Sequence, residues 1–375
     1  MAVKEIKDMG ASVLTRLKKQ AKETGINYQT CLQLFAQEEF LRKLEMSGYA
    51  ENLVLKGGMF LYTISNYEGR PTMDIDFMLR RMSNDVAGME TIMEEICQTD
   101  THNDFISMKV LGTGKITPEK KYPGIGINLM AHIKNVRIPF SVDIGVDDVI
   151  VPGAVKRTVA TRLEGFEEPN IYTYSLESTM AEKLDAILKR MTASSRMKDF
   201  YDIYYWSQVF DFEGRVLQEA ISETLQHRGT PYEKDSMEQI RAFDQNEFLQ
   251  KLWNNYNPGP GLEKPDFSSV LVQINRFISP VYGALLREDE FLGCGHRKKT
   301  YGNNLLKKIA YQRLYFPTLC EASHNVGKTT TTVNLGAGLA MQGNDCREDR
   351  LCHCADWTSE QIFRNTEHVS RAWFY

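Results

Sequence analysis

The chain has 375 residues, which is more than one domain usually needs, so we expect two domains or one domain with appendages. Its apolar fraction of 42% suffices for a sizeable core, and it contains no run of 18 apolar residues that would predict a transmembrane helix or a membrane partner. The first residues mix charges early and lack an apolar signal core, so we expect a cytoplasmic protein. The net charge of −4 neither requires nor excludes a nucleic-acid partner.

The first half of the chain alternates helix and strand patterns. Two helices are predicted between residues 3 and 48, followed by a short strand at 52–58, a short helix at 59–67 and a strand at 74–80. A helix at 86–98 then precedes three further strands, at 105–113, 124–133 and 136–146. This order predicts an α+β fold with a mixed sheet and flanking helices.

The second half of the chain predicts a helical bundle. Apolar residues recur at helical spacing in five segments, which are 175–191, 196–210, 213–226, 237–256 and 267–286. The Pro/Gly-rich stretch 257–266 connects the last two. We therefore expect an α/β domain over residues 1–170, a helical domain over 171–290, and a degenerate, poorly ordered tail over 291–375.

The stretch "RPTMDIDFML" places Asp74 and Asp76 two positions apart, so both point to the same face of a strand. A later strand carries Asp143 in "SVDIG". Three carboxylates that converge on one sheet face suit one or two Mg²⁺ ions, which take oxygen ligands and would hold a triphosphate for in-line attack. The alternative interpretation is that Asp74 caps a turn and Asp76 makes a surface ion pair.

The glycine pair Gly57-Gly58 in "LKGG" lies upstream, at a turn from a strand into a helix. Two glycines let backbone N–H groups approach a phosphate, and the following helix contributes its positive N-terminus. A glycine pair alone is typical of any tight turn. A glycine pair between a strand and a helix, with a DxD pattern on the next strand and a later acidic strand, resembles the nucleotidyltransferase fold of the DNA polymerase β superfamily.

A second cluster lies in "AEKLDAILKRMTASSRMKDFYDIYYW", residues 181–206. Lys183 lies within one predicted helix, and Asp199 and Asp202 share a face of the next because they are three positions apart. One interpretation is a solvated helix pair with ion pairs on its surface. The other is a lysine that contacts a γ-phosphate and is held by a neighbouring aspartate.

Four ordered motifs, "LVLKGGMFLY", "RPTMDIDF", "RIPFSVDIGVDDVIVP" and "EKLDAILKRMTASSRMKDFYDIY", resemble the AbiEii/AbiGii toxin family over residues 25–285. That family consists of nucleotidyltransferase-like toxins of type IV toxin–antitoxin and abortive-infection systems. The resemblance implies a DNA polymerase β-like fold, NTP as substrate, Mg²⁺ as cofactor, an acceptor such as tRNA or another RNA, and an antitoxin encoded nearby. Growth inhibition and phage defence are the expected outcome.

The resemblance also implies roles for single residues. Lys56, Gly57 and Gly58 would bind the nucleotide, and Lys183 would contact its phosphates. Asp74 and Asp76 would hold the metal, and Asp143 would be a further metal ligand or a base for the incoming hydroxyl. Asp199 and Asp202 would complete the far wall of the catalytic site. One departure matters, because Met59 stands where the superfamily commonly has a Ser or Thr hydroxyl that binds phosphate.

The tail carries a second motif, "SHNVGKTTTTVNLGAGLAMQGN", which resembles the P-loop of ParA/MinD-type partition ATPases. Gly327, Lys328 and Thr329 match that loop, but Ala322 replaces its first glycine and no apolar strand precedes it. We therefore expect a truncated fragment. Five of the seven cysteines also lie in the last 82 residues, and the close spacing of Cys352 and Cys354 does not favour a zinc site.

The leading hypothesis is a Mg²⁺-dependent nucleotidyltransferase that acts as a toxin. The first alternative is a catalytically impaired relative that only binds its partners, as the substitution at Met59 would suggest. The second is a partition-type ATPase, which the altered P-loop disfavours.

Overall fold

The computed structural model describes residues 8–116, 123–291 and 293–295. All described residues belong to one compact unit of the chain. The P-loop-like segment at 323–344 and the remainder of the predicted tail from residue 296 onwards lie outside the described residues.

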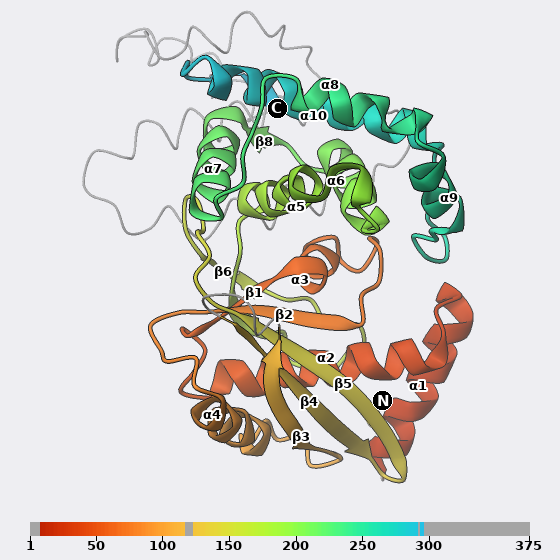
Figure 1. The fold of residues 1–375 in the computed structure, drawn as a ribbon. Coiled ribbons are helices and arrows are strands. Elements are labelled where there is room, and N and C mark those ends of the chain that lie inside the picture. The colour runs from red at the N-terminus through yellow and green to blue at the C-terminus, as the bar shows by residue number, and fades with distance from the viewer. Residues whose placement is uncertain (1–7, 117–122, 292, 296–375) are drawn as a thin grey trace, which may run out of the picture. The chain divides into compact units, whose positions relative to one another are not determined.

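Within the described residues, a mixed sheet of seven strands has the order β3-β4-β5-β2-β1-β7-β6 (Figure 1). Its strands are β1 (Leu53–Lys56), β2 (Asp74–Leu79), β3 (Ile106–Ile116), β4 (Gly124–Ile133), β5 (Val136–Gly145), β6 (Val155–Thr158) and β7 (Asn170–Thr173). Strand β2 lies at the centre, parallel to β5 and antiparallel to β1. Both of its edges are therefore hydrogen-bonded.

The helices divide between the two halves of the chain. Those of the first half are α1 (Met9–Thr24), α2 (Tyr28–Met46), α3 (Gly57–Ile64) and α4 (Val86–Gln98). Those of the second half are α5 (Leu176–Arg190), α6 (Met197–Val209), α7 (Gly214–His227), α8 (Ser236–Arg241), α9 (Glu247–Asn255) and α10 (Phe267–Leu286), with 3-10 turns η1 (Met191–Ala193) and η2 (Ala242–Gln245). Two short strands, β8 (Phe212–Glu213) and β9 (Cys294–Gly295), pair with each other.

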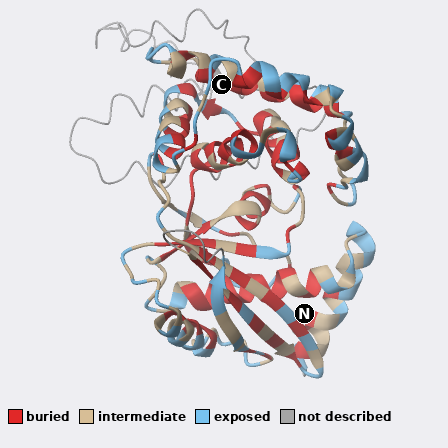
Figure 2. Cartoon of the chain, viewed as in Figure 1, coloured by how far each residue is buried: buried red, intermediate tan, exposed pale blue. Residues whose placement is uncertain are grey.

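The alternation predicted for β5 is confirmed, because Ile138, Phe140, Val142 and Ile144 are all buried while their neighbours are exposed or half-buried (Figure 2). This apolar face packs on α2, where the Phe40 ring lies 6.2 Å from the Phe140 ring between centroids. Helix α4 packs on β3 beside it. One face of the sheet is thus covered by α2 and α4, and the residues between the apolar ones point the other way.

The second half forms a helical bundle in which α5, α6, α7 and α10 pack against one another. Aromatic rings fill its interior, as where Phe200 of α6 meets Phe267 of α10 edge-on at 5.6 Å between centroids. Helix α10 continues through Pro280 without a break. No helix in the described part of the chain has the length and apolarity needed to cross a membrane.

Two kinds of difference from the sequence prediction occur. The four short strands β6, β7, β8 and β9 were not predicted, although β7 pairs with β1 in the sheet and β8 pairs with β9. The single helix expected at 237–256 is instead α8, η2 and α9, because Asn246 leaves the helical conformation and its side chain accepts a hydrogen bond from Leu249 N at the start of α9.

The α+β class, with a mixed sheet and flanking helices followed by a helical bundle, is confirmed. The last strand of the sheet ends at Thr173 and the first helix of the bundle begins at Leu176. The division of the chain into domains at residue 170 stays a prediction.

Candidate active site

Two of the predicted acidic residues face each other across the centre of the sheet. Asp76 of β2 is in register with Asp143 of β5 on one side and with Lys56 of β1 on the other. Residues in register on neighbouring strands point to the same face. Asp74 shares this face because it lies two residues before Asp76, so the strand pairing gathers all three aspartates on the side of the sheet opposite α2.

The electrostatics of Asp76 and Asp143 depend on burial and on the charges around them. The pKa of Asp76 is raised to about 6, chiefly by burial, and the charges of Asp74 and Asp143 raise it further. Lys56 and Lys198 act in the opposite direction and lower this pKa. Burial followed by the charge of Asp74 likewise raises the pKa of Asp143. A concentration of negative charge of this kind favours a cation between the carboxylates.

The turn at Gly57 brings backbone against this acidic group. Gly57 has a φ of +68°, and a Cβ atom placed on it would lie 2.3 Å from Asp76 Oδ2. Helix α3 begins at this turn, and no side chain caps its first N–H groups. The uncapped start of a helix beside a cation site is a suitable place for phosphate oxygens.

The amino group of Lys56 is engaged by two other carboxylates. Its Nζ lies 2.8 Å from Asp148 Oδ2 and 2.9 Å from Glu182 Oε1. Arg228, at the end of α7, pairs with the same two residues at 2.7 and 3.0 Å. These four side chains join β1 to the helical half of the chain, and a direct contact of Lys56 with nucleotide stays a prediction.

Lys183, Asp199 and Asp202 come together in a buried ion network. Lys183 Nζ lies 2.6 Å from Asp202 Oδ2 and 3.3 Å from Asp199 Oδ1. Arg70 pairs with Asp202, and Arg196 pairs with Asp199 at 2.6 Å. The amino group of Lys183 is thus engaged by two carboxylates. A contact between Lys183 and phosphate also stays a prediction.

The charge of Lys198 reaches the aspartate group, although the sequence did not single this residue out. It is half-buried, directly precedes Asp199 on α6, and has no ion pair or hydrogen bond to any described residue. Its charge nevertheless lowers the pKa of Asp76. The only sequence signal was its place in the basic stretch "KRMTASSRMKD", which does not show that its charge acts on Asp76.

A divalent cation fits the aspartate group when part of its coordination comes from substrate. Within residues 8–116, 123–291 and 293–295, no group of three or more Asp, Glu, His or Cys side chains is placed so that it could hold a metal ion by itself. Mg²⁺ is commonly held by one or two carboxylates together with water and substrate phosphates. Asp74, Asp76 and Asp143 offer those carboxylates beside the turn where phosphates would lie.

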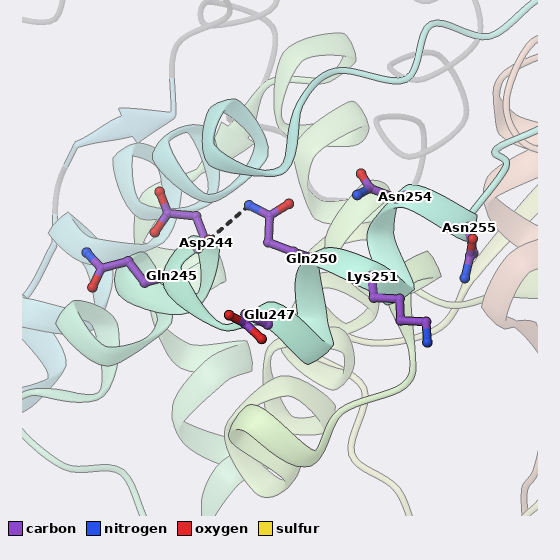
Figure 3. A pocket seen from close by; sticks show the side chains of 7 residues that line it. All are labelled: Asp244, Gln245, Glu247, Gln250, Lys251, Asn254 and Asn255. Carbon is purple, nitrogen blue, oxygen red and sulfur yellow. Dashed lines mark hydrogen bonds between the residues drawn. The ribbon is translucent and has the colours of Figure 1, made fainter.

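One surface pocket lies elsewhere, along η2 and α9 (Figure 3). Its lining is polar and comes from a single stretch of chain, Asp244 to Asn255. None of the predicted site residues contributes to it. Its side chains include Glu247, Gln250 and Lys251, and Gln250 bonds back to the Asp244 carbonyl at 2.9 Å. The pocket therefore adds nothing to the aspartate site.

Comparison with known proteins identifies the family. The sequence pattern of the family described as nucleotidyl transferase AbiEii toxin, type IV TA system, matches residues 39–273, more than half of the chain. No curated protein sequence matches the chain.

Two solved structures match much of the chain at low sequence identity. MenT4, a nucleotidyltransferase toxin from Mycobacterium tuberculosis H37Rv, is 16% identical with a TM-score of 0.49, and the match covers 79% of this chain and 92% of that chain. A putative nucleotidyltransferase from H. pylori is 11% identical with a TM-score of 0.42, and the match covers 71% of this chain and 100% of that chain. On the family match over residues 39–273, the chain belongs to the AbiEii nucleotidyltransferase toxins of type IV toxin–antitoxin systems.

Proposed function

We propose that this protein is a Mg²⁺-dependent toxin that transfers a nucleotide from an NTP to an RNA acceptor such as tRNA. Members of the family generally use an NTP and a divalent metal ion. The single observation that supports the site is the register of Asp76 with Asp143, beside a glycine turn whose N–H groups are uncapped. The proposed biological role is growth arrest in the cytoplasm, as part of abortive infection and phage defence. An antitoxin encoded nearby would oppose it.

The proposed reaction assigns one task to each group of residues. The N–H groups at Gly57 and Gly58 bind phosphate oxygens, and Lys198 balances their negative charge. When bound at Asp74 and Asp76, the metal ion supplies charge neutralisation at the reacting phosphate. Asp143 accepts the proton of the acceptor hydroxyl as its oxygen bonds to the α-phosphorus. The bond between the α-phosphorus and the bridging oxygen breaks, and pyrophosphate leaves with the electron pair.

The test is nucleotide transfer by the full chain. Each labelled NTP is incubated separately with Mg²⁺, total tRNA and protein, and the mass of the RNA is measured. We expect one NTP to give a defined mass increase that disappears in an Asp74→Ala/Asp76→Ala variant. The matched control is Asp104→Ala/Asp211→Ala, because both residues are exposed aspartates away from the sheet centre.

Equal labelling by the wild type and the Asp74→Ala/Asp76→Ala variant would contradict the assignment of the site. Absence of any labelling by the wild type, with every NTP, would contradict the proposed RNA acceptor.

A further inference from the structure

Two polar side chains occupy the space beside the second glycine of the turn. A Cβ atom placed on Gly58 would lie 2.9 Å from Thr72 Oγ1 and 3.5 Å from Arg70 Nη2. Both residues come from the segment between α3 and β2. They therefore lie beside the first turn of α3, in the direction in which a side chain at position 58 would project.

The hydroxyl of Thr72 is buried but poorly satisfied. Thr72 is only 6% exposed, and its hydroxyl makes contacts of 3.4 and 3.5 Å with the backbone of Asp74. These lengths are at the limit of a hydrogen bond, whereas buried hydroxyl groups normally have a good partner. The hydroxyl thus has capacity for a further hydrogen bond at Gly58.

The guanidinium of Arg70 is oriented by the ion network of the helical half. Its Nε and Nη2 atoms donate to the two oxygens of Asp202 at 3.3 and 3.2 Å, and Asp202 is in turn held by Lys183 at 2.6 Å. The remaining contact of Arg70 is a 3.5 Å approach of Nη1 to the Pro71 carbonyl. A guanidinium carries five N–H groups, so donors remain for another anion.

Met59 provides no polar group here, because its side chain is fully buried in the core. We propose that the Thr72 hydroxyl and the Arg70 guanidinium bind phosphate oxygens of the nucleotide at the Gly57-Gly58 turn and replace the hydroxyl that residue 59 lacks. Lys183 is then a positioning residue, which fixes Asp202 and through it Arg70. This assignment rests on the proposed function, since it places the triphosphate of the same NTP.

The decisive test is equilibrium binding to the full chain with Mg²⁺, which needs no acceptor and no turnover. The probes are an NTP analogue that cannot be cleaved between the α- and β-phosphates, and inorganic tripolyphosphate as competitor. Thr72→Val removes only the hydroxyl, and we expect it to weaken the binding of both probes about tenfold. Thr72→Ser should bind as the wild type does. Thr224→Val is the matched control, since Thr224 is also a buried threonine, on α7.

Arg70→Met should weaken the binding of both probes by at least about tenfold. Arg70→Lys should have an affinity between those of Arg70→Met and the wild type. Lys183→Met should weaken binding in the wild type and add nothing in an Arg70→Met background, because a positioning residue acts only through its target. Additive losses would instead mean that Lys183 contacts phosphate itself and would overturn its positioning role.

Thr72→Val decides the proposal even if the charge variants fold poorly, since it leaves the ion network intact. Wild-type affinity of Thr72→Val for both probes would overturn the assignment while leaving the proposed transfer activity in place. Failure of the wild type to bind any NTP analogue would contradict the proposed function, and the assignment with it.

Discussion

At Gly57 the backbone conformation and a neighbouring carboxylate both require the absence of a side chain. A φ of +68° is strained for any other residue, and a new Cβ atom would lie 2.3 Å from Asp76 Oδ2. We expect Gly57→Ala to lower the free energy of unfolding by about 1–3 kcal/mol. Transfer activity should fall further than this loss explains, because the displaced carboxylate belongs to the proposed metal site. Urea unfolding and the transfer assay measure the two effects.

Gly153→Ala is the control for this substitution, since its φ is not in the left-handed region and no atom lies within 4 Å of the added Cβ. If Gly57→Ala were as stable and active as Gly153→Ala, the close packing of the turn on Asp76 would have no functional importance.

Helix α2 is buried around most of its circumference, including several charged side chains (Figure 2). Burial raises the pKa of Glu38 from 4.5 to about 7, against the opposing charges of Arg42 and Arg162. The folded protein therefore retains a proton there that the unfolded chain releases at lower pH. The stability that this group contributes is fully present below about pH 4.5 and is lost as the pH rises through about 7.

We expect Glu38→Gln to reduce this pH dependence. Between pH 5 and 8 the wild type should lose up to roughly 3 kcal/mol more unfolding free energy than the variant, as measured by urea denaturation. The amide retains an oxygen that can accept the hydrogen bond from Arg162 N. Parallel pH profiles for the two proteins would show that Glu38 is ionised in the folded state throughout.

Periodicity predicted the elements that have enough residues to display it. The alternation of Ile138 to Ile144 indicated β5, and the i, i+2 spacing of Asp74 and Asp76 indicated their common face. Strands β6 and β7 span four residues each, with the sequences VKRT and NIYT, and lack the apolar run LVL that indicated the equally short β1. The break at Asn246 depends on a cap within an otherwise continuous helical pattern.

The parts of the site that the sequence did not reveal are those set by contacts between distant segments. Arg70 meets Asp202 across 132 residues of chain, and Lys56 meets Glu182 across 126. No local spacing encodes such pairs. The sequence therefore predicted that aspartates and glycines gather at the centre of the sheet. It did not predict that Arg70 pairs with Asp202 or that Lys56 pairs with Glu182.

At the scale of the whole molecule, all residues assigned to the site precede residue 296. The family match also ends before it, at residue 273. We expect a chain ending at Gly295 to retain nucleotide transfer and to unfold within a few degrees of the full chain. Differential scanning calorimetry and the transfer assay compare the two. A truncated chain that is insoluble or inactive would show that residues 296–375 contribute to folding or catalysis.

The central place of β2 has a consequence for hydrogen exchange. Its amides are bonded to strands on both sides, and Ile75 and Phe77 are fully buried. Amide protons in such a strand exchange with solvent only through global opening. The first amides of α3 have no side-chain cap and should exchange rapidly. Nucleotide binding would then slow exchange at Gly58 and Met59, while the protection of the strand that carries Asp74 and Asp76 changes only with the overall stability.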